Sequence, residues 1–487
     1  MDTWCRHAVC GLDRRVRLKR YIIECQFTVM NTDRFEDENP RTSNVTSQST
    51  HVTDEDRDTT YSSKCQSNHS KDPFHLSDNE EDSSDIYRPV IKKRCIAVLA
   101  NDLNLNVSEI AVKKTPRVAY VHSQDLLTKA NELIRIEGRA ELVHSLIRTY
   151  GLLQYLQVVT PRPATQSEIL AFHSSDYIQC LQDISAVSDS EDIEEQHKHE
   201  VESYGLSYDC PLQKDLLETA SLISGASQAA SQHIINGLAD IVINWYGGWH
   251  HAKRDTASGF CYINDVVLCI LKLRQQFDKV LYVDIDLHHG DGVEEAFATT
   301  SKVMTVSFHK LAPGFFPGSG ELNDVGTGRG KYFTVNIPLM DGIKDKEYFS
   351  IFTKVMKQVK DRFLPDAIVM QCGADTLSED PMTSFNLTHF GIAKCVCYML
   401  TWNLPTVLLG GGGYHFPNTA KCWTFLTALA AGKKLPVDIP EHEHFLDYGP
   451  SYELTTSPGN KRDLNTDQYL ANIVSTIEKN LNNVSLS

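Results

Sequence analysis

Acidic and histidine residues gather where one apolar segment of the sequence ends. The segment Val280–Ile285 runs into Asp286 and His288, and a two-residue strand period places Asp284, Asp286 and His288 on one side of the chain. Two buried carboxylates without partners would be costly or would become protonated, so a bound cation is the simplest explanation. The alternative, in which these acids only cap loops and helix starts, explains the pattern less well, because two further segments carry matching groups.

The first of these segments, Ala367–Gln371, leads to Asp375. Asp and His are suitable ligands for Zn²⁺, and a catalytic zinc site keeps three protein ligands and one open position. Asp286, His288 and Asp375 supply that number. We therefore expect these three residues to hold one divalent metal.

The second segment, Ile241–Trp245, leads to the tandem pair His250 and His251. The carboxylates that the metal does not need, Asp284 and Asp291, can orient the two imidazoles and raise their basicity. The two histidines then remain for proton transfer. A lone histidine is more often a packed core residue than a catalyst, so this interpretation depends on the neighbouring strand ends.

A run of four glycines separates the apolar segment Thr406–Leu409 from Tyr414. Glycine permits backbone conformations and close approaches that other residues do not. The run would present the Tyr414 hydroxyl to the site as a donor to a developing oxyanion. Taken alone, the glycines are equally well explained as a flexible turn.

Elements that alternate between strand and helix must position these groups. Apolar β-branched runs predict strands, and amphipathic stretches between them predict helices. This alternation predicts an α/β fold with a mostly parallel central sheet, helices on both faces, and ligands bound outside the carboxyl ends of the strands. The predicted strands are Val118–Val121, Ile241–Trp245, Val280–Ile285, Val303–Phe308, Ala367–Gln371 and Thr406–Leu409. The predicted helices are Glu168–Leu181, Leu216–Ile235, Asn264–Phe277 and Tyr348–Phe363.

Composition divides the 487 residues into an extension and a folded domain. Residues 1–113 include a long stretch of Ser, Thr, Asp, Glu and Asn with few apolar residues, which predicts a largely disordered extension, and residues 114–487 form the predicted domain. The net charge of −16 disfavours nucleic-acid backbones and favours basic partners. Nucleic acid is therefore not an expected partner. No apolar run approaches the roughly eighteen residues of a membrane span, so a membrane is not an expected partner either.

The cysteines and two short basic clusters indicate the cellular compartment of the protein. The cysteines from Cys180 to Cys422 lie in apolar segments without zinc-knuckle spacing, which predicts buried, reduced thiols and a reducing compartment. Residues 14–20 and 92–94 are basic clusters of the kind that can act as nuclear signals.

Four blocks of the sequence resemble the signature segments of the class I histone deacetylases. They are, in order, Trp245–Asp265, Asp284–Gly292, Gly373–Asp375 and Gly410–Tyr414, and the similarity extends from about Pro116 to the C-terminus. The resemblance implies an arginase–deacetylase domain that hydrolyses the acetyl amide of N6-acetyl-lysine in histones and other proteins. It also implies chromatin-associated partners and a nuclear location, with the cytoplasm as the alternative.

The resemblance further implies roles for individual residues. The implied metal ligands, for Zn²⁺ or alternatively Fe²⁺, are Asp286, His288 and Asp375. The implied catalytic residues are His251 as general base and acid, His250, Tyr414, Asp284 and Asp291. The implied substrate-binding residues are Asp209, Gly259, Phe260, Phe316, Trp249, Met382 and Arg139. The implied potassium site comprises Asp284, Asp286, His288, Ser307 and Phe308.

Other activities fit the sequence in different degrees. An arginase-like ureohydrolase needs carboxylates at the positions of Gly290 and Leu377, so a two-manganese centre lacks ligands. An acetylpolyamine amidohydrolase or a longer-chain lysine deacylase would share the metal site, and assays are needed to separate them. A non-catalytic corepressor scaffold would be favoured by loss of a ligand or of Tyr414, and neither is lost.

Overall fold

The structure, a computed structural model, describes residues 116–484 apart from 186–198, 200, 207 and 383. The predicted extension over residues 1–113 lies outside the described residues, as do the two basic clusters. The described chain is built around one eight-stranded parallel sheet with the strand order β2-β1-β3-β8-β7-β4-β5-β6. The predicted fold class is thus confirmed.

Six of the strands coincide with the predicted ones, with ends that shift by one or two residues. The strands are β1 Val118–Val121, β2 Gln157–Val159, β3 Ile241–Asn244, β4 Val280–Asp284, β5 Val303–Lys310, β6 Thr334–Leu339, β7 Ala367–Gln371 and β8 Thr406–Leu409. β4 ends at Asp284 because the Asp286 N–H turns back to the Asp284 carboxylate, with N and Oδ1 3.0 Å apart.

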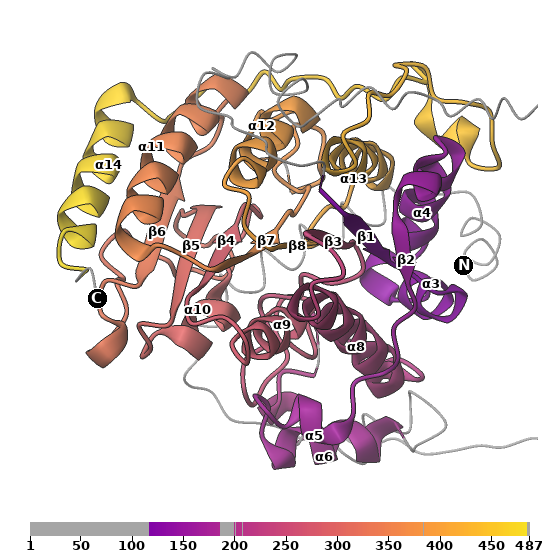
Figure 1. The fold of residues 1–487 in the computed structure, drawn as a ribbon, viewed down its shortest axis with the longest axis horizontal. Helices are drawn as coiled ribbons and strands as arrows, with labels where there is room; N and C mark the ends of the chain where they lie inside the picture. The colour runs from indigo at the N-terminus through magenta and orange to yellow at the C-terminus, as the bar shows by residue number, and fades with distance from the viewer. Residues whose placement is uncertain (1–115, 186–198, 200, 207, 383, 485–487) are drawn as a thin grey trace, which may run out of the picture. The chain divides into compact units, whose positions relative to one another are not determined.

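Helices cover both faces of the sheet, with α4, α11, α12 and α13 on one side and α8, α9 and α10 on the other (Figure 1). The helices are α3 Gln124–Asn131, α4 Arg139–Thr149, α5 Gln166–Ile169, α6 Ser175–Ser185, α8 Leu216–Ile235, α9 Asp265–Leu273, α10 Asp291–Phe297, α11 Asp345–Phe363, α12 His389–Leu400, α13 Phe416–Ala430 and α14 Asp467–Leu481. None of the helices in the described ranges is long and apolar enough to cross a membrane.

Alternate residues of the central strands enter two separate apolar cores. Ile243 and Val283 belong to the core beneath α11 to α13, whereas Val242 and Tyr282 belong to the core against α8 and α9. This alternation is the period of two that a strand imposes. Burial on both faces explains why the central strands read as continuous apolar runs, as parallel sheets require.

The predicted helix Glu168–Leu181 is wrong, because the chain forms two helices there. A capping box between Thr165 and Glu168 starts α5 at Gln166, and α5 ends at Ile169. The break turns His173 inward, where its Nδ1 lies 3.1 Å from the Arg254 carbonyl oxygen and its Nε2 accepts the Asn264 N–H at 3.0 Å. The break therefore ties α6 to the loop that follows the tandem histidines.

The cysteines from Cys180 to Cys422 are all buried and free of disulfides, as predicted. Burial raises the pKa of the Cys422 thiol and of the Cys395 thiol, so neither forms a thiolate readily. These cysteines act as small apolar residues of the core.

Candidate active site

The groups predicted to do chemistry lie at the carboxyl ends of four neighbouring strands. β3, β8, β7 and β4 are adjacent in that order, so the segments that follow them meet at one edge of the sheet. This edge is where open parallel sheets bind ligands. The strand ends bring together His250 and His251 after β3, Asp286 and His288 after β4, Asp375 after β7, and Tyr414 after β8.

Asp286, His288 and Asp375 form a buried group whose candidate ligand atoms all lie within 4.8 Å of one another. His288 Nδ1 is 3.2 Å from Asp286 Oδ1 and 3.0 Å from Asp375 Oδ2. Ligand atoms of a tetrahedral zinc with bonds of about 2.1 Å would lie roughly 3.4 Å apart. The three side chains therefore fit one such ion with little rearrangement.

The electrostatics of this group favour a positive charge. Burial opposes an imidazolium, but the hydrogen bonds and charges of Asp286 and Asp375 outweigh it and raise the pKa of His288 to about 10. Burial and the charge of Asp286 raise the pKa of Asp375 to about 6. A cation shared among the three side chains would relieve the cost of two buried carboxylates.

Neighbouring backbone and side-chain donors fix the two carboxylates. Asp286 Oδ2 accepts the Gln371 side-chain amide at 2.6 Å and the Gly412 N–H at 2.8 Å, and Asp375 Oδ1 accepts the Leu287 N–H at 3.0 Å. A Cβ added at Gly412 would lie 2.2 Å from Asp375 Oδ2. Glycine is therefore required there to let the backbone reach the ligands.

The second group of the described residues that could hold a metal is Glu141, Glu443 and His444. It lies toward the surface, and Glu443 is already bound by Ser145 and Arg148. Only the group at the strand ends combines complete burial with neighbouring proton-transfer residues.

Each tandem histidine is paired with its own carboxylate, as predicted. His250 Nδ1 lies 2.7 Å from Asp284 Oδ2, and His251 Nδ1 lies 2.7 Å from Asp291 Oδ1. Asp284 Oδ2 also accepts the Tyr282 hydroxyl at 2.6 Å. With both Nδ1 atoms occupied, each ring turns its Nε2 atom toward the site.

Tyr414 follows the glycine run at the end of β8. Its ring packs edge-on against Phe260, with 5.8 Å between the centroids. Burial and the charges of Asp375 and Asp286 raise the pKa of the Tyr414 hydroxyl far above its usual value. The hydroxyl therefore stays protonated and can donate a hydrogen bond.

Phe316 and the loop that carries Phe260 lie close to His251. Phe316 packs edge-on against His251 with 4.9 Å between the ring centroids. Phe260 has a positive φ of 69°, and it follows Gly259, where a Cβ would lie 2.4 Å from the His251 ring. Asp209 Oδ2 accepts the Gly259 N–H at 2.7 Å, so this carboxylate fixes the loop that carries Phe260.

Arg139 lies deeper than these rings and is 4% exposed. Its Nη1 donates to the carbonyls of Gly411 and Gly413, both at 3.0 Å. The guanidinium also lies over the Trp423 ring, 5.1 Å from its centroid. Arg139 therefore contacts the backbone of the glycine run that carries Tyr414.

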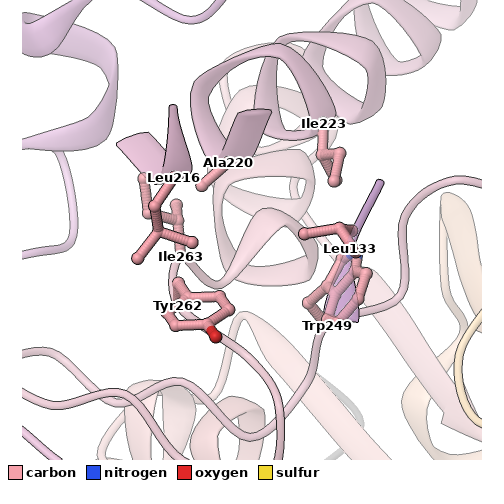
Figure 2. A pocket seen from close by; sticks show the side chains of 7 residues that line it. All are labelled: Leu133, Leu216, Ala220, Ile223, Trp249, Tyr262 and Ile263. Carbon is pink, nitrogen blue, oxygen red and sulfur yellow. The ribbon is translucent and has the colours of Figure 1, made fainter. Parts of the chain in front are cut away.

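Trp249 borders an apolar crevice instead of the metal group. The Trp249 indole donates to the Tyr246 carbonyl at 2.8 Å. Figure 2 shows the side chains that line the crevice: Leu133, Leu216, Ala220, Ile223, Trp249, Tyr262 and Ile263. Trp249 is thus the predicted substrate-binding residue that lines this crevice.

The residues predicted for potassium lie on the adjacent strands β4 and β5 or just after β4, and their side chains point in different directions. The register of β4 and β5 pairs Asp284 with Ser307. The Ser307 hydroxyl lies 2.9 Å from His309 Nδ1. The Phe308 side chain instead packs in the core against Phe352, with ring centroids 4.9 Å apart, so only its backbone is available to an ion.

Sequence reasoning missed two buried residues of the site. Gln371 binds Asp286, and Asp380 accepts the Tyr414 N–H at 2.6 Å. The position of Gln371 at the end of a predicted strand was a usable signal, because the other strand ends carry functional groups. Asp380 has no such signal, since it lies within a loop.

Comparisons with known proteins show the family of this chain. The histone deacetylase domain family matches residues 135–430, which is more than half of the chain. Histone deacetylase 8 of Danio rerio is 51% identical over 371 residues, covering 76% of this chain and 97% of the relative. Histone deacetylase 8 of Xenopus tropicalis is 50% identical over 366 residues, covering 75% and 98%. Histone deacetylase 1 of Homo sapiens is 45% identical over 343 residues, covering 70% of each chain.

Within class I, two features of the sequence favour histone deacetylase 8. They are Trp249 after the glycine pair and the segment Pro313–Pro317. The two histone deacetylase 8 relatives agree with that interpretation, since each is matched over nearly its whole length. The chain therefore belongs to the histone deacetylase family, as a class I hydrolytic deacetylase similar to histone deacetylase 8.

Proposed function

We propose that this deacetylase hydrolyses the acetyl amide of N6-acetyl-lysine with one divalent metal held by Asp286, His288 and Asp375. Histones and other acetylated proteins are the substrates of this family. The observation that carries the proposal is the His288 imidazole between two buried carboxylates, beside two histidine–aspartate pairs. Zn²⁺ suits this donor set best, and Fe²⁺ is the alternative.

Proton transfer falls to His251 in this mechanism. A bound divalent metal would polarise the acetyl carbonyl and lower the pKa of a bound water. His251 Nε2 takes the proton of the attacking water and passes it to the departing lysine amine. Asp291 stabilises the imidazolium, and His250, paired with Asp284, assists electrostatically in the site.

Tyr414 supplies the hydrogen bond that the developing oxyanion needs. Its hydroxyl is protonated at neutral pH, and its position is fixed through the backbone of the glycine run. A preorganised donor of this kind stabilises charge that appears only in the transition state.

The remaining predicted residues bind the substrate or line the path by which acetate leaves. Phe260 and Phe316 flank the lysine methylenes, the Gly259 carbonyl accepts the substrate amide N–H, and Asp209 binds the substrate backbone at the rim. Arg139 lies at the inner end, where acetate leaves. The contact of Asp209 with Gly259 supports this arrangement, because one carboxylate then fixes the rim and the channel wall. Trp249 and Met382 complete the proposed substrate-binding set.

A potassium ion is proposed beside the metal ligands. Its ligands would be oxygen atoms of Asp284, Asp286, His288, Ser307 and Phe308, with backbone carbonyls where the side chains are apolar or engaged elsewhere. The pairing of Asp284 with Ser307 across β4 and β5 supports the idea. Such an ion would fix the turn that carries the metal ligands.

We propose the domain boundaries, the cellular location and the partners from composition and family membership. Residues 114–487 form the catalytic domain, and residues 1–113 are an extension that catalysis does not need. We place the enzyme in the nucleus, with the cytoplasm as the alternative, and expect chromatin-associated protein partners. The net charge of −16 favours basic histone tails over direct contact with nucleic acid.

A panel of substrates tests the function. Full-length protein is freed of metal, reloaded with Zn²⁺ or Fe²⁺, and assayed on one histone-tail peptide carrying acetyl-, butyryl- or myristoyl-lysine, and on N-acetylspermidine. We expect the highest kcat/KM on acetyl-lysine peptide and loss of activity in the metal-free protein. A preference for the polyamine or for a long acyl chain would reassign the substrate, and an inactive metal-loaded protein would favour a scaffold.

A further inference from the structure

Asp380 is a buried carboxylate that holds the backbone of Tyr414 in place. Its Oδ2 accepts the Tyr414 N–H at 2.6 Å and the His415 N–H at 3.1 Å. Its Oδ1 accepts the Met382 N–H at 2.9 Å. Asp380 is 1% exposed, so all three contacts are shielded from water.

The glycine run gives Tyr414 no rigidity of its own. Gly411 and Gly413 have positive φ angles of 144° and 136°, which residues with a side chain rarely adopt. Other residues are excluded here, since a Cβ at Gly413 would lie 2.6 Å from the Thr419 hydroxyl oxygen. A segment that must be glycine has the largest conformational freedom, so its geometry has to be imposed by contacts from outside.

Those contacts come from three charged side chains. Arg139 binds the carbonyls of Gly411 and Gly413, and Asp286 binds the Gly412 N–H. Both side chains bind residues that precede Tyr414 in the sequence. Asp380 binds the N–H of Tyr414 itself, on the residue whose side chain must be oriented.

We propose that Asp380 is a positioning residue that holds the Tyr414 hydroxyl where the oxyanion develops. The proposal rests on the proposed function, in which Tyr414 is the donor to the oxyanion. Asp380 reaches no reacting atom itself. It acts through the Tyr414 backbone, and its second oxygen accepts the N–H of Met382 on its own loop.

The surroundings of Asp380 act on its charge in opposite directions. Burial and the nearby Asp375 carboxylate raise the pKa of Asp380 to about 8, whereas the three N–H donors favour its charged form. The helix α13 starts at Phe416, immediately after the two N–H groups, and the positive end of its dipole also favours an anion. A buried carboxyl group is costly unless it is hydrogen-bonded, and both oxygens of Asp380 accept backbone N–H groups.

A purely structural role is the competing explanation, because a carboxylate at a helix start also stabilises that helix. The two roles differ in how they couple to Tyr414. A structural role lowers stability and affects the enzyme equally with or without the Tyr414 hydroxyl. A positioning role loses its effect once the hydroxyl has gone.

The test compares Asp380→Asn with Glu379→Gln in the full-length, metal-loaded enzyme. Glu379 is the exposed neighbour on the same loop, and its carboxylate binds the Asn418 side chain of α13 at 2.7 Å, so it is a matched control. We expect Asp380→Asn to lower kcat about tenfold or more on an acetyl-lysine peptide, with KM and metal content little changed. Glu379→Gln should leave all three unchanged.

The same substitution in the Tyr414→Phe background decides between the two roles. We expect Asp380→Asn to lower the residual kcat of Tyr414→Phe less than twofold. An equal fold loss in both backgrounds, or a loss only in KM or in metal content, would overturn the positioning role. An inactive parent enzyme would instead count against the proposed function, so the two failures are distinguishable.

A measurement on the unmodified enzyme applies even if Asp380→Asn does not fold. Hydrogen exchange should show the amides of Tyr414 and His415 protected to the degree of the α13 interior, because Asp380 binds both. Exchange of these amides at the rate of an exposed loop would overturn the proposal.

Discussion

The Nε2 atoms of His250 and His251 lie 3.0 Å apart, in a site where the Nδ1 atom of each ring contacts its own carboxylate. With both Nδ1–H groups donated to carboxylates, each Nε2 carries a lone pair until it binds a proton. A contact of this length therefore requires that one of the two Nε2 atoms binds a proton and donates it to the other. Burial and the charge of His250 lower the pKa of His251 to about 4, whereas the Asp284 and Asp286 carboxylates outweigh burial and raise that of His250 to about 9.

The two histidines should differ in their contribution to catalysis. His251 contacts the ring of Phe316 in the proposed channel, whereas His250 Nε2 lies toward Asp286 at 4.0 Å, on the metal side. We expect His251→Ala to lower kcat by about 10²–10⁴, and His250→Ala to lower it less. Single-turnover kinetics on metal-loaded protein measure this difference. A larger loss in His250→Ala would exchange the two roles.

Tyr414→Phe should preserve folding, metal content and substrate binding but lower kcat by about 10²–10³. The hydroxyl matters more as charge develops than in the ground state, so KM should move far less. Steady-state kinetics beside calorimetric peptide binding make the comparison. Tyr469→Phe is the control, because it removes a hydroxyl that binds only the distant Pro338 carbonyl. A kcat loss below about tenfold, or one seen wholly in KM, would contradict the assignment.

Asp375→Ala should abolish both metal retention and turnover, because it removes one of three proposed ligands. Elemental analysis after dialysis against metal-free buffer measures the retained ion. Glu443→Gln alters the second candidate metal group of the described residues, and we expect this variant to retain one metal ion per chain. Full occupancy in Asp375→Ala would show that the ligand set is wrong.

The unfolding free energy should fall in acid partly through His173. Burial lowers the pKa of His173 to about 4, so the folded state binds fewer protons there than the unfolded state does. This contribution is fully present above about pH 6.5 and is lost as the pH falls toward 4, which amounts to about 3 kcal/mol. Urea unfolding at several pH values should show a shallower pH slope for His173→Gln than for the parent. Equal slopes would refute the contribution.

Removing residues 1–113 should leave peptide deacetylation within about twofold of the full chain. The domain family match begins only at residue 135, which supports an extension outside the catalytic part. Turnover and thermal melting of the two proteins provide the measurement. Loss of folded, active enzyme would place part of the extension within the domain.

The strand ends could be predicted from the sequence because a buried parallel strand has a visible apolar run and an abrupt polar end. β6 was missed because Asn336 and Pro338 interrupt its apolar pattern, and proline is tolerated there since β6 is an edge strand. Asp380 was missed for another reason. Its partners, the N–H groups of Tyr414 and His415, lie 34 and 35 residues further along the chain, so only the folded structure shows the contact.

The strand order also sets a sequence of events during synthesis. The strands made first form two separate groups, β2-β1-β3 and β4-β5-β6, which share no hydrogen bond until β7 and β8 enter between them. β7 and β8 are the last two strands to leave the ribosome, and they carry Asp375 and Tyr414 at their ends. A nascent chain therefore holds an open, unjoined sheet until late in translation, with edges that need protection from mispairing. A chain cut short before residue 406 would lack β8 and Tyr414, and its two groups of strands would stay unjoined.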